Sequence, residues 1–463
     1  MAACGLPHFQ CVGENGAARF CAGWSMRLLL VDPQGASLDI AMRAHRDGHD
    51  VMMVVRDTPK TRDIGKGIVK VVDGIRIASH LNWAELVVLA DNTRWLDDVD
   101  AYRSAGGLVV GPSKEAADWE LDREIGQQVM RKNGITVPPY RIFKDYDSAI
   151  AYVKKEDRRF VSKPSGDADK ALSYVSKTPA DMVYMLERWK KFGKLKGDFI
   201  LQDFKAGMEM AVGGFWGPGG FNEGWCENFE FKKLMNSDLG VATGEQGTVL
   251  RFVRTSKLAR KMLTPLQEDL ERIGYTGYID VNTIIDEDGN IWPLEFTMRP
   301  GWPTFNIQQA LNEGDTVEWL MDLAQGRDAR NFSLDRLAIG VVLSIPDYPY
   351  SHITRKEVTG IPIYGIKPGM WQHLHPCEMM LEVAANDVDG KIVNMPMPCT
   401  AGDYVLVMTA IADTIGQAKE TVYRRLKRLV VPNSPMYRTD IGDRLSKQLP
   451  LLQKMGFASG MTF

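Results

Sequence analysis

The chain of 463 residues lacks the features typical of membrane, disulfide-rich or nucleic-acid-binding proteins. No apolar run is long enough to cross a bilayer. The six cysteines are sparse and form no CxxC pair, which favours a reduced, cytoplasmic compartment. A formal net charge of −3, without a long basic run, argues against a nucleic-acid polymer as the partner. The remaining composition is that of an ordinary globular protein, and the length of the chain predicts about two to four domains.

The first 25 residues differ from the rest of the chain. Met1–Ser25 holds three of the six cysteines and has no clear periodicity, whereas Met26 opens the buried-strand sequence MRLLLVD. A signal peptide would need a basic start and a longer apolar core. We therefore expect residues 1–25 to be an extension outside the fold, with Met26 as the natural start.

The segment 26–112 predicts a doubly wound parallel sheet. Buried strands are predicted at Arg27–Asp32, His49–Val55, Leu86–Ala90 and Gly107–Gly111. Strands that alternate with helices are typical of this architecture. The turn PQGAS after the first strand could hold a phosphate at a helix N-terminus, but it has only Gly35, so a simple βα turn is favoured.

Mixed α and β patterns follow Pro112. We expect a long helix over Glu115–Lys132 and a glycine-rich mobile loop over Asn236–Gly247. Strands are predicted at Arg158–Lys163, Asp198–Phe204 and Leu337–Ile345, and an amphipathic basic helix at Thr414–Leu429. The run His373, His375 and Cys377 has the spacing of a metal motif, but alternation within one strand gives the same spacing. No second ligand cluster supports a metal there.

The segment Tyr278–Pro303 predicts a hairpin whose strands carry acids. Two apolar runs flank the turn Asp286–Asn290, and Asp280 and Glu295 interrupt them. A carboxylate inside a strand is costly unless it has a partner. Two of them on paired strands could share Mg²⁺, with Arg299 meeting a phosphate. The alternative is a plain hairpin with acids at its ends.

Residues at other strand ends suggest a nucleotide. Lys163 ends a strand, and a lysine there can hold nucleotide phosphates. Gln202, Asp203 and Phe204 end the next strand, where backbone groups can read adenine. Asp203 or Glu209 can accept ribose hydroxyls. Each signal is weak by itself.

In sequence order these features follow the layout of the ATP-grasp fold, and the chain after residue 25 resembles the phosphoribosylamine–glycine ligase (glycinamide ribonucleotide synthetase) family. The matching segments are GPSKEAADWE at Gly111–Glu120, GITVPPY at Gly134–Tyr140, VSKP at Val161–Pro164, LQDFKAGMEM at Leu201–Met210, FKKLMNSDLGVATGEQG at Phe231–Gly247, LEFTMRPGWP at Leu294–Pro303, TAIADTIGQAKETVYRRLKRL at Thr409–Leu429 and MYRTDIG at Met436–Gly442.

The resemblance implies an ATP-dependent ligase of purine biosynthesis that joins a glycine-like carboxylate to an amine through an acyl phosphate, as a monomer or small homo-oligomer. It implies Mg²⁺ or Mn²⁺ held by Asp280, Glu295 and Thr297. It implies ATP binding by Arg123, Lys163, Gln202, Asp203, Phe204 and Glu209. It implies catalytic roles for Arg299, Asp238 and Lys163, with the Asp238–Gly247 loop closing over the site.

It also implies three domains after the extension at 1–25. These are an N-terminal α/β domain at 26–112, an ATP-grasp domain at 113–333 with a small lobe at about 136–205, and a C-terminal α+β domain at 334–463.

Two substrate motifs of the family are missing. Its phosphoribosyl-binding turn GxGGREHAL is replaced by DPQGASLDI at Asp32–Ile40, and its GPExPLxxG motif by ADNTRWLDD at Ala90–Asp98. Thr297 replaces the metal asparagine. Three functions remain open: glycinamide ribonucleotide synthesis, the same chemistry on a different amine or nucleotide substrate, or a catalytically silent nucleotide-binding regulator.

Overall fold

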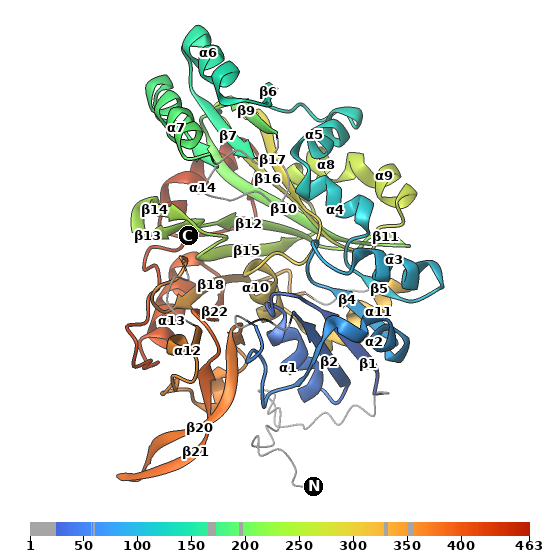
Figure 1. The fold of residues 1–463 in the computed structure, drawn as a ribbon, viewed down its shortest axis with the longest axis vertical. Helices are drawn as coiled ribbons and strands as arrows, with labels where there is room; N and C mark the ends of the chain where they lie inside the picture. Colours follow the sequence, from blue (N-terminus) through green and yellow to red (C-terminus); the bar gives the residue numbers. More distant parts are fainter. Residues whose placement is uncertain are drawn as a thin grey trace.

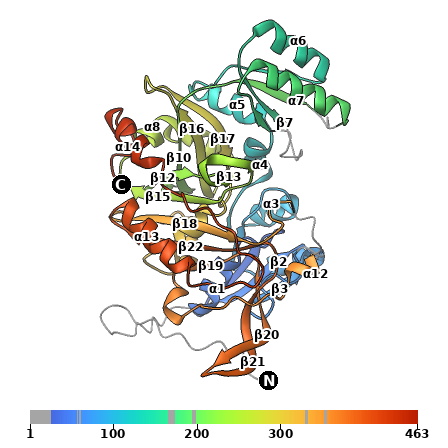
Figure 2. The ribbon, with the colours of Figure 1, turned by 90° about the vertical axis from the view of Figure 1, so that its left-hand side faces the viewer.

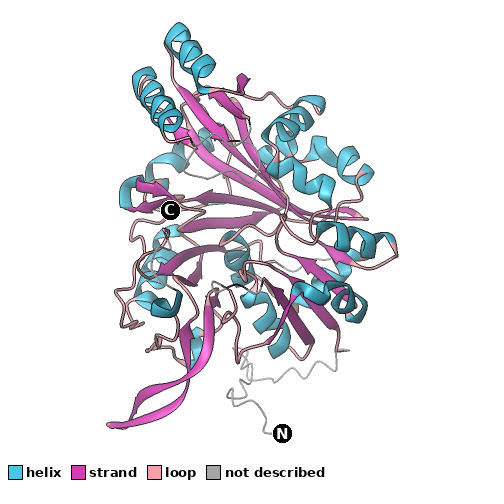
Figure 3. Ribbon diagram, viewed as in Figure 1, coloured by secondary structure: helices cyan, strands magenta, loops and turns pink. Residues whose placement is uncertain are grey.

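The computed structural model describes residues 25–56, 58, 61–164, 173–193, 198–327, 332–350 and 355–463. The expected extension, apart from Ser25, lies outside these residues. The fold combines a parallel sheet flanked by helices, a small four-stranded sheet and a large antiparallel sheet (Figures 1 and 3). In the described ranges, no helix has both the length and the apolar character that crossing a membrane requires.

The N-terminal unit is the predicted doubly wound sheet, with strand order β3-β2-β1-β4-β5 and parallel pairing throughout. Its strands are β1 (Arg27–Val31), β2 (Asp50–Val55), β3 (Lys70–Asp73), β4 (Leu86–Leu89) and β5 (Val109–Val110), and its helices are α1 (Leu38–Arg46), α2 (Ile77–Trp83) and α3 (Leu96–Ser104). Leu28 and Leu30 pack into one hydrophobic core, and Leu29 and Val31 into another. Both faces of β1 are therefore covered, as its unbroken apolar sequence predicts.

A small lobe with a separate core projects from the top of the molecule in Figure 1. Its sheet has the order β6-β9-β7-β8. The elements are β6 (Tyr140–Phe143), α6 (Tyr146–Glu156), β7 (Phe160–Pro164), β8 (Tyr174–Val175), α7 (Pro179–Lys191) and β9 (Phe199–Asp203). Aromatic rings of Phe143, Tyr146 and Phe199 pack together between the sheet and both helices. This core positions Lys163 on β7 and Gln202 on β9.

The large antiparallel sheet has the order β17-β16-β10-β12-β15-β18-β22-β19. Its strands are β10 (Met208–Gly217), β12 (Trp225–Glu230), β15 (Gly247–Val253), β16 (Gly277–Ile285), β17 (Ile291–Thr297), β18 (Leu337–Ser344), β19 (Leu374–Pro376) and β22 (Tyr404–Ala412), with the short β11 (Gly220–Phe221) beside β10. The ladder between β15 and β18 runs from Gly247 opposite Val341 to Arg251 opposite Leu337. The sheet therefore continues across the expected boundary between residues 333 and 334.

Helices pack around this sheet. They are α4 (Lys114–Leu121), α5 (Arg123–Lys132), α8 (Lys257–Met262), α9 (Gln267–Arg272), α10 (Thr304–Ala310), α11 (Thr316–Ala324), α12 (Arg355–Val358), α13 (Ile415–Leu426) and α14 (Leu445–Lys454). The expected single helix over Glu115–Lys132 is wrong. Asp122 has a non-helical backbone, and its side chain accepts hydrogen bonds from the N–H groups of Glu124 and Ile125, so it caps a second helix.

Two hairpins stand apart from the large sheet. One pairs β13 (Lys233–Met235) with β14 (Leu239–Ala242), inside the segment expected to be a mobile loop. The other pairs β20 (Met379–Val388) with β21 (Lys391–Thr400) and extends as an arm from the lower end of the molecule (Figure 2). The arm exposes apolar side chains, among them Val383 and Ile392.

Candidate active site

One face of the large sheet collects the polar residues of the predicted hairpin. Asp280 lies opposite Thr297, and Asn282 lies opposite Glu295, in the ladder between β16 and β17. Residues opposite each other or two apart in a strand project to the same face, so these four side chains share it. Glu209 on β10 joins them, because it lies opposite Ile284, two residues beyond Asn282.

Asp280 is 3% exposed and held by neutral donors. Its Oδ2 accepts hydrogen bonds from Asn228 Nδ2 at 2.9 Å and from the Tyr278 hydroxyl at 3.0 Å. Burial, together with the charge of Glu230, raises the pKa of Asp280 to about 7. Its other oxygen, Oδ1, is buried without a hydrogen-bond partner. The group therefore has a spare acceptor directed into the protein.

Glu295 is balanced by three cations. Arg123 Nη1 lies 2.6 Å from its Oε2, and Lys232 Nζ lies 3.8 Å from its Oε1. Burial would raise its pKa, but the charges of Arg123, Lys232 and Lys163 hold it well below the usual range. Lys163 Nζ donates to the carbonyl of Leu294 at 3.2 Å. Burial lowers the pKa of Lys163 to about 8, although Glu295 opposes that shift.

Lys232 is the hub of this charged set, and our reading of the sequence did not single it out. Its Nζ lies 2.8 Å from Glu209 and 3.2 Å from Glu230. Burial would lower the pKa of Lys232, but the surrounding carboxylates raise it. It directly follows Phe231 in the segment FKKLMNSDLG that carries the family resemblance. That motif was the signal that could have identified it.

The predicted adenine and ribose residues end β9. Gln202 is buried, and its Nε2 donates to Gln127 Oε1 at 3.3 Å. The carboxylate of Asp203 forms an ion pair with Arg158, and its N–H donates to the carbonyl of Pro139. These contacts fix the position of Asp203, and its role toward ribose hydroxyls stays a prediction.

Next to this strand end, the ring of Phe204 lies 3.5 Å from the Arg159 guanidinium. A small pocket opens nearby between α4, α5 and β17. It is lined by Trp119, Arg123, Gly126, Gln127, Met130, Leu294, Glu295 and Phe296. Arg123 and Glu295 thus connect this pocket to the charged face.

Arg299 follows β17 and is fixed by Glu120. Its Nη2 donates to Glu120 Oε1 at 2.9 Å, and Glu120 Oε2 accepts the Met298 N–H at 2.8 Å. Burial would lower the pKa of Arg299, but Glu120 and Asp91 raise it. The guanidinium is therefore a permanent charge, placed where the hairpin meets the N-terminal unit.

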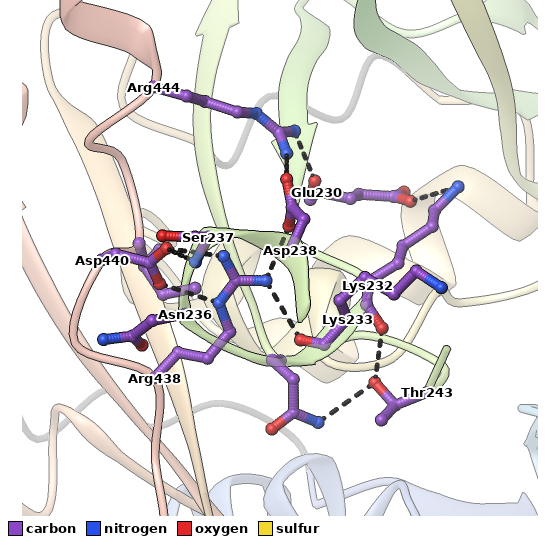
Figure 4. A network of polar contacts seen from close by, with 12 residues as sticks. Glu230, Lys232, Lys233, Asn236, Ser237, Asp238, Thr243, Arg438, Asp440 and Arg444 are labelled. Atoms are coloured by element: carbon purple, nitrogen blue, oxygen red, sulfur yellow. Dashed lines mark hydrogen bonds and ion pairs between the residues drawn. The ribbon is translucent and has the colours of Figure 1, made fainter. Parts of the chain in front are cut away.

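Asp238 is linked to the charged set through Arg444, as Figure 4 shows, because Arg444 Nη2 donates to the Glu230 carbonyl at 2.6 Å. The Asp238 carboxylate pairs with Arg438 at 2.8 Å and with Arg444 at 3.5 Å. Asp440 accepts the Ser237 N–H at 2.8 Å and also pairs with Arg438. These contacts bind the β13–β14 hairpin to the C-terminal segment. The structure does not bring Asp238 into contact with Asp280, Glu295 or Thr297, the predicted metal ligands.

The oxygen atoms on the sheet face fit a hard divalent cation. Asn282 Oδ1, Asn228 Oδ1 and Thr248 Oγ1 are buried without hydrogen-bond partners, as is Asp280 Oδ1. Magnesium prefers such oxygen ligands. In the described ranges, no three His, Cys, Asp or Glu residues converge as a metal site, so amide and hydroxyl oxygens would have to complete it. Asn282 is a candidate that sequence reasoning missed.

Within the HxHxC run, His375 links two parts of the fold. His375 is buried on β19, with Nδ1 2.7 Å from Asp39 Oδ2 and Nε2 3.0 Å from Thr409 Oγ1. Arg43 Nη2 lies 3.1 Å from the same Nδ1. The histidine therefore joins α1 of the N-terminal unit to the large sheet.

A small α+β lobe set against a large antiparallel sheet, with lysines and carboxylates where they meet, defines an ATP-grasp protein. Residues 122–304 match the family model described as phosphoribosylglycinamide synthetase, ATP-grasp (A) domain. The phosphoribosylamine–glycine ligase of Ralstonia nicotianae is 25% identical over 358 residues, covering 75% of this chain and 81% of that protein. The Salmonella typhimurium enzyme of the same name is 23% identical over 403 residues, covering 83% and 89%.

Solved structures agree in fold. The phosphoribosylamine–glycine ligase of Thermotoga maritima superposes with a TM-score of 0.67 at 18% identity, over 90% of this chain and all of that one (100%). The biotin carboxylase of Campylobacter jejuni gives 0.60 at 13% identity, over 94% and 96%. The chain is therefore similar to phosphoribosylamine–glycine ligases over most of its length, and residues 122–304 match the ATP-grasp domain of that family.

Proposed function

We propose that the chain is an ATP-dependent carboxylate–amine ligase that works through an acyl phosphate, with ADP and phosphate as products. The observation that carries this is the shared face of Asp280, Asn282 and Glu295, with Lys163 and Lys232 beside it. Relatives named phosphoribosylamine–glycine ligase support a glycine-like carboxylate and an amine as substrates.

The residues of the chain mainly bind the substrates and place charges around the reacting groups. Lys163, Arg123 and Lys232 would hold the ATP phosphates, releasing Glu295 from its ion pairs. Asp280, Asn282 and Glu295, with Thr297 at the end of the strand, would hold Mg²⁺ or Mn²⁺, which offsets phosphate charge when bound. These groups are placed before the reaction, so they need little rearrangement as charge develops.

Two displacements follow. A substrate carboxylate oxygen attacks the γ-phosphorus of ATP, the bond from that phosphorus to the bridging oxygen breaks, and ADP leaves. The neutral amine then attacks the acyl carbon, phosphate leaves, and the nitrogen loses a proton. Arg299 is placed to orient the transferring phosphoryl group. Exclusion of water from the cleft would protect the acyl phosphate.

The test is ADP release with ATP, Mg²⁺ and glycine, with and without phosphoribosylamine, followed by a panel of amines. Amine-dependent ADP release supports the ligase. Hydroxylamine added with glycine should trap the acyl phosphate as a hydroxamate. Tight ATP binding without ADP or hydroxamate would instead indicate the silent regulator.

A further inference from the structure

The turn after β1 is filled by a carboxylate of the chain itself. Asp32 is 1% exposed. Its Oδ1 accepts the N–H groups of Gln34 at 3.0 Å and Gly35 at 2.9 Å, and its Oδ2 accepts the Ser37 N–H at 2.5 Å. Such N–H groups at the start of a helix are the ones that bind a phosphate in other proteins. Here Asp32 already satisfies them, and its charge would repel a phosphate.

This turn lies where a parallel sheet of this topology binds ligands. In the order β3-β2-β1-β4-β5 the connections reverse direction between β1 and β4, and ligands occupy the crevice at the carboxyl ends of those strands. Asp91, just after β4, raises the pKa of Asp32 in addition to burial. The neighbouring Asn92 is 4% exposed, and its Nδ2 has no hydrogen-bond partner. The crevice therefore holds Asp91, the nearby charge of Arg299 and an unused polar group, Asn92 Nδ2.

The segment Arg299–Thr304 joins this crevice to the ATP-grasp face. Trp302 Nε1 donates to the Ala90 carbonyl at 3.4 Å. Two residues later, Thr304 Oγ1 donates to Glu245 at 3.2 Å. A substrate lying along the segment would have Asp91 at one end and Glu245 at the other.

Glu245 is a buried carboxylate without a direct ion pair. It is 6% exposed, and in the described ranges no Lys, Arg or His nitrogen lies within ion-pair distance of it. Burial raises its pKa well above the usual range, Glu230 adds to this, and the more distant charge of Lys232 opposes it. In the described ranges, a single hydroxyl donor, Thr304, serves both oxygens of Glu245, and an ammonium group would supply three further donors.

We propose that the amine substrate carries no phosphate and bears a second, protonated amino group, which Glu245 binds. This rests on the proposed ligase function. The nitrogen that attacks the acyl phosphate must be neutral. The protonated amino group held by Glu245 is therefore a second amino group of the same molecule, and the substrate is a diamine. At the other end, Asp32 already occupies the N–H groups that a phosphate would need.

The test compares amines in the ADP-release assay with glycine: 1,4-diaminobutane, n-butylamine as its matched monoamine, and phosphoribosylamine. We expect kcat/KM for 1,4-diaminobutane to exceed that for n-butylamine by about 10- to 100-fold, because a hydrogen bond to a charged group contributes a free energy of that size. Glu245→Gln should abolish that preference. Glu313→Gln, at an exposed position, serves as the matched control and should retain it.

Calorimetry separates failure of the inference from failure of the ligase function. Wild-type protein should bind 1,4-diaminobutane and not ribose 5-phosphate, and Glu245→Gln should weaken diamine binding about tenfold. Binding of ribose 5-phosphate, or phosphoribosylamine as the best amine, would overturn the inference while leaving the ligase intact. Absence of hydroxamate would count against the ligase function alone. The calorimetric binding measurements would still decide the substrate class.

Discussion

At the scale of single residues, the site is a balance of buried charges. Glu295 is paired with Arg123, and Lys232 is paired with Glu209 and Glu230. A buried charge that loses its partner is costly, so these residues depend on one another. The balance also suits an ATP site, because phosphates and a divalent cation can replace the internal partners without leaving charges unpaired.

Replacing Glu295 with glutamine is expected to abolish ATP turnover while the fold remains. The change removes a predicted metal ligand and leaves Arg123 without its carboxylate. We expect kcat to fall at least about 100-fold, as for other preorganised charges. Steady-state ADP release measures this, with circular dichroism as the folding check. Glu287→Gln, on the exposed turn of the same hairpin, is the control, and equal activity in both variants would refute the metal role.

His375 should make the protein less stable as the pH falls. Burial lowers the pKa of His375 below its ordinary value of 6.5. Below that value the unfolded chain binds a proton that the folded chain does not, so the free energy of unfolding decreases by up to about 1.4 kcal/mol per pH unit. Thermal midpoints between pH 7.5 and 5.5 should fall less in His375→Gln than in wild type. The control is His45→Gln, at an exposed position on α1, and an unchanged slope in His375→Gln would contradict the prediction.

Strand alternation was enough to predict the carboxylate pair at the residue scale, because Asp280 and Glu295 interrupt apolar runs on neighbouring strands. Alternation also places Asn282 on the same face, two residues after Asp280 on β16, but an amide carries no charge that marks it as a site residue. Lys232 lies between β12 and β13 and joins the site through ion pairs with Glu209 and Glu295, so the family motif was its signal in the sequence.

At the scale of elements, the β13–β14 hairpin differs most from expectation. Its sequence is rich in glycine and poor in large apolar residues, which predicts a mobile loop. The structure pairs it as a hairpin and fixes it through Arg438, which is 2% exposed and lies over the ring of Phe231. Asp238, the hairpin partner of Arg438, is 200 residues away in sequence, so this anchoring could not be predicted locally.

Replacing Arg438 with methionine should release this hairpin. The substitution keeps much of the packing but leaves Asp238 and Asp440 without their shared cation. Hydrogen exchange of residues 233–242 should accelerate, by about 10-fold or more for a lost charged hydrogen bond. Arg424→Met, on the exposed face of α13, is the matched control. Equal exchange in both variants would show that the hairpin is held by other contacts.

At the scale of the whole molecule, the large sheet unites the ATP-grasp and C-terminal parts. The order of the parts is predictable from the sequence, because motifs and composition change along the chain. The pairing of β15 with β18 is not, since strands on either side of a predicted boundary give no sign of joining one sheet. The domain boundary near residue 333 therefore stays a prediction. In the structure, the sheet and its hydrophobic core include residues from both sides of it.

The shared sheet predicts which parts of the chain can be removed. A chain ending after Ser333 lacks β18, which exposes the β15 edge and the apolar face that β18 covers, so it should aggregate. Replacing residues 384–395 of the β20–β21 arm with Asn-Gly should instead leave a soluble protein with unchanged ATP turnover. The arm is a separate, largely exposed hairpin, and Val383 and Pro396 already face each other across it. Size-exclusion chromatography and ADP release compare the two proteins. A soluble, folded product from the first deletion would mean that the ATP-grasp part is stable without its neighbour.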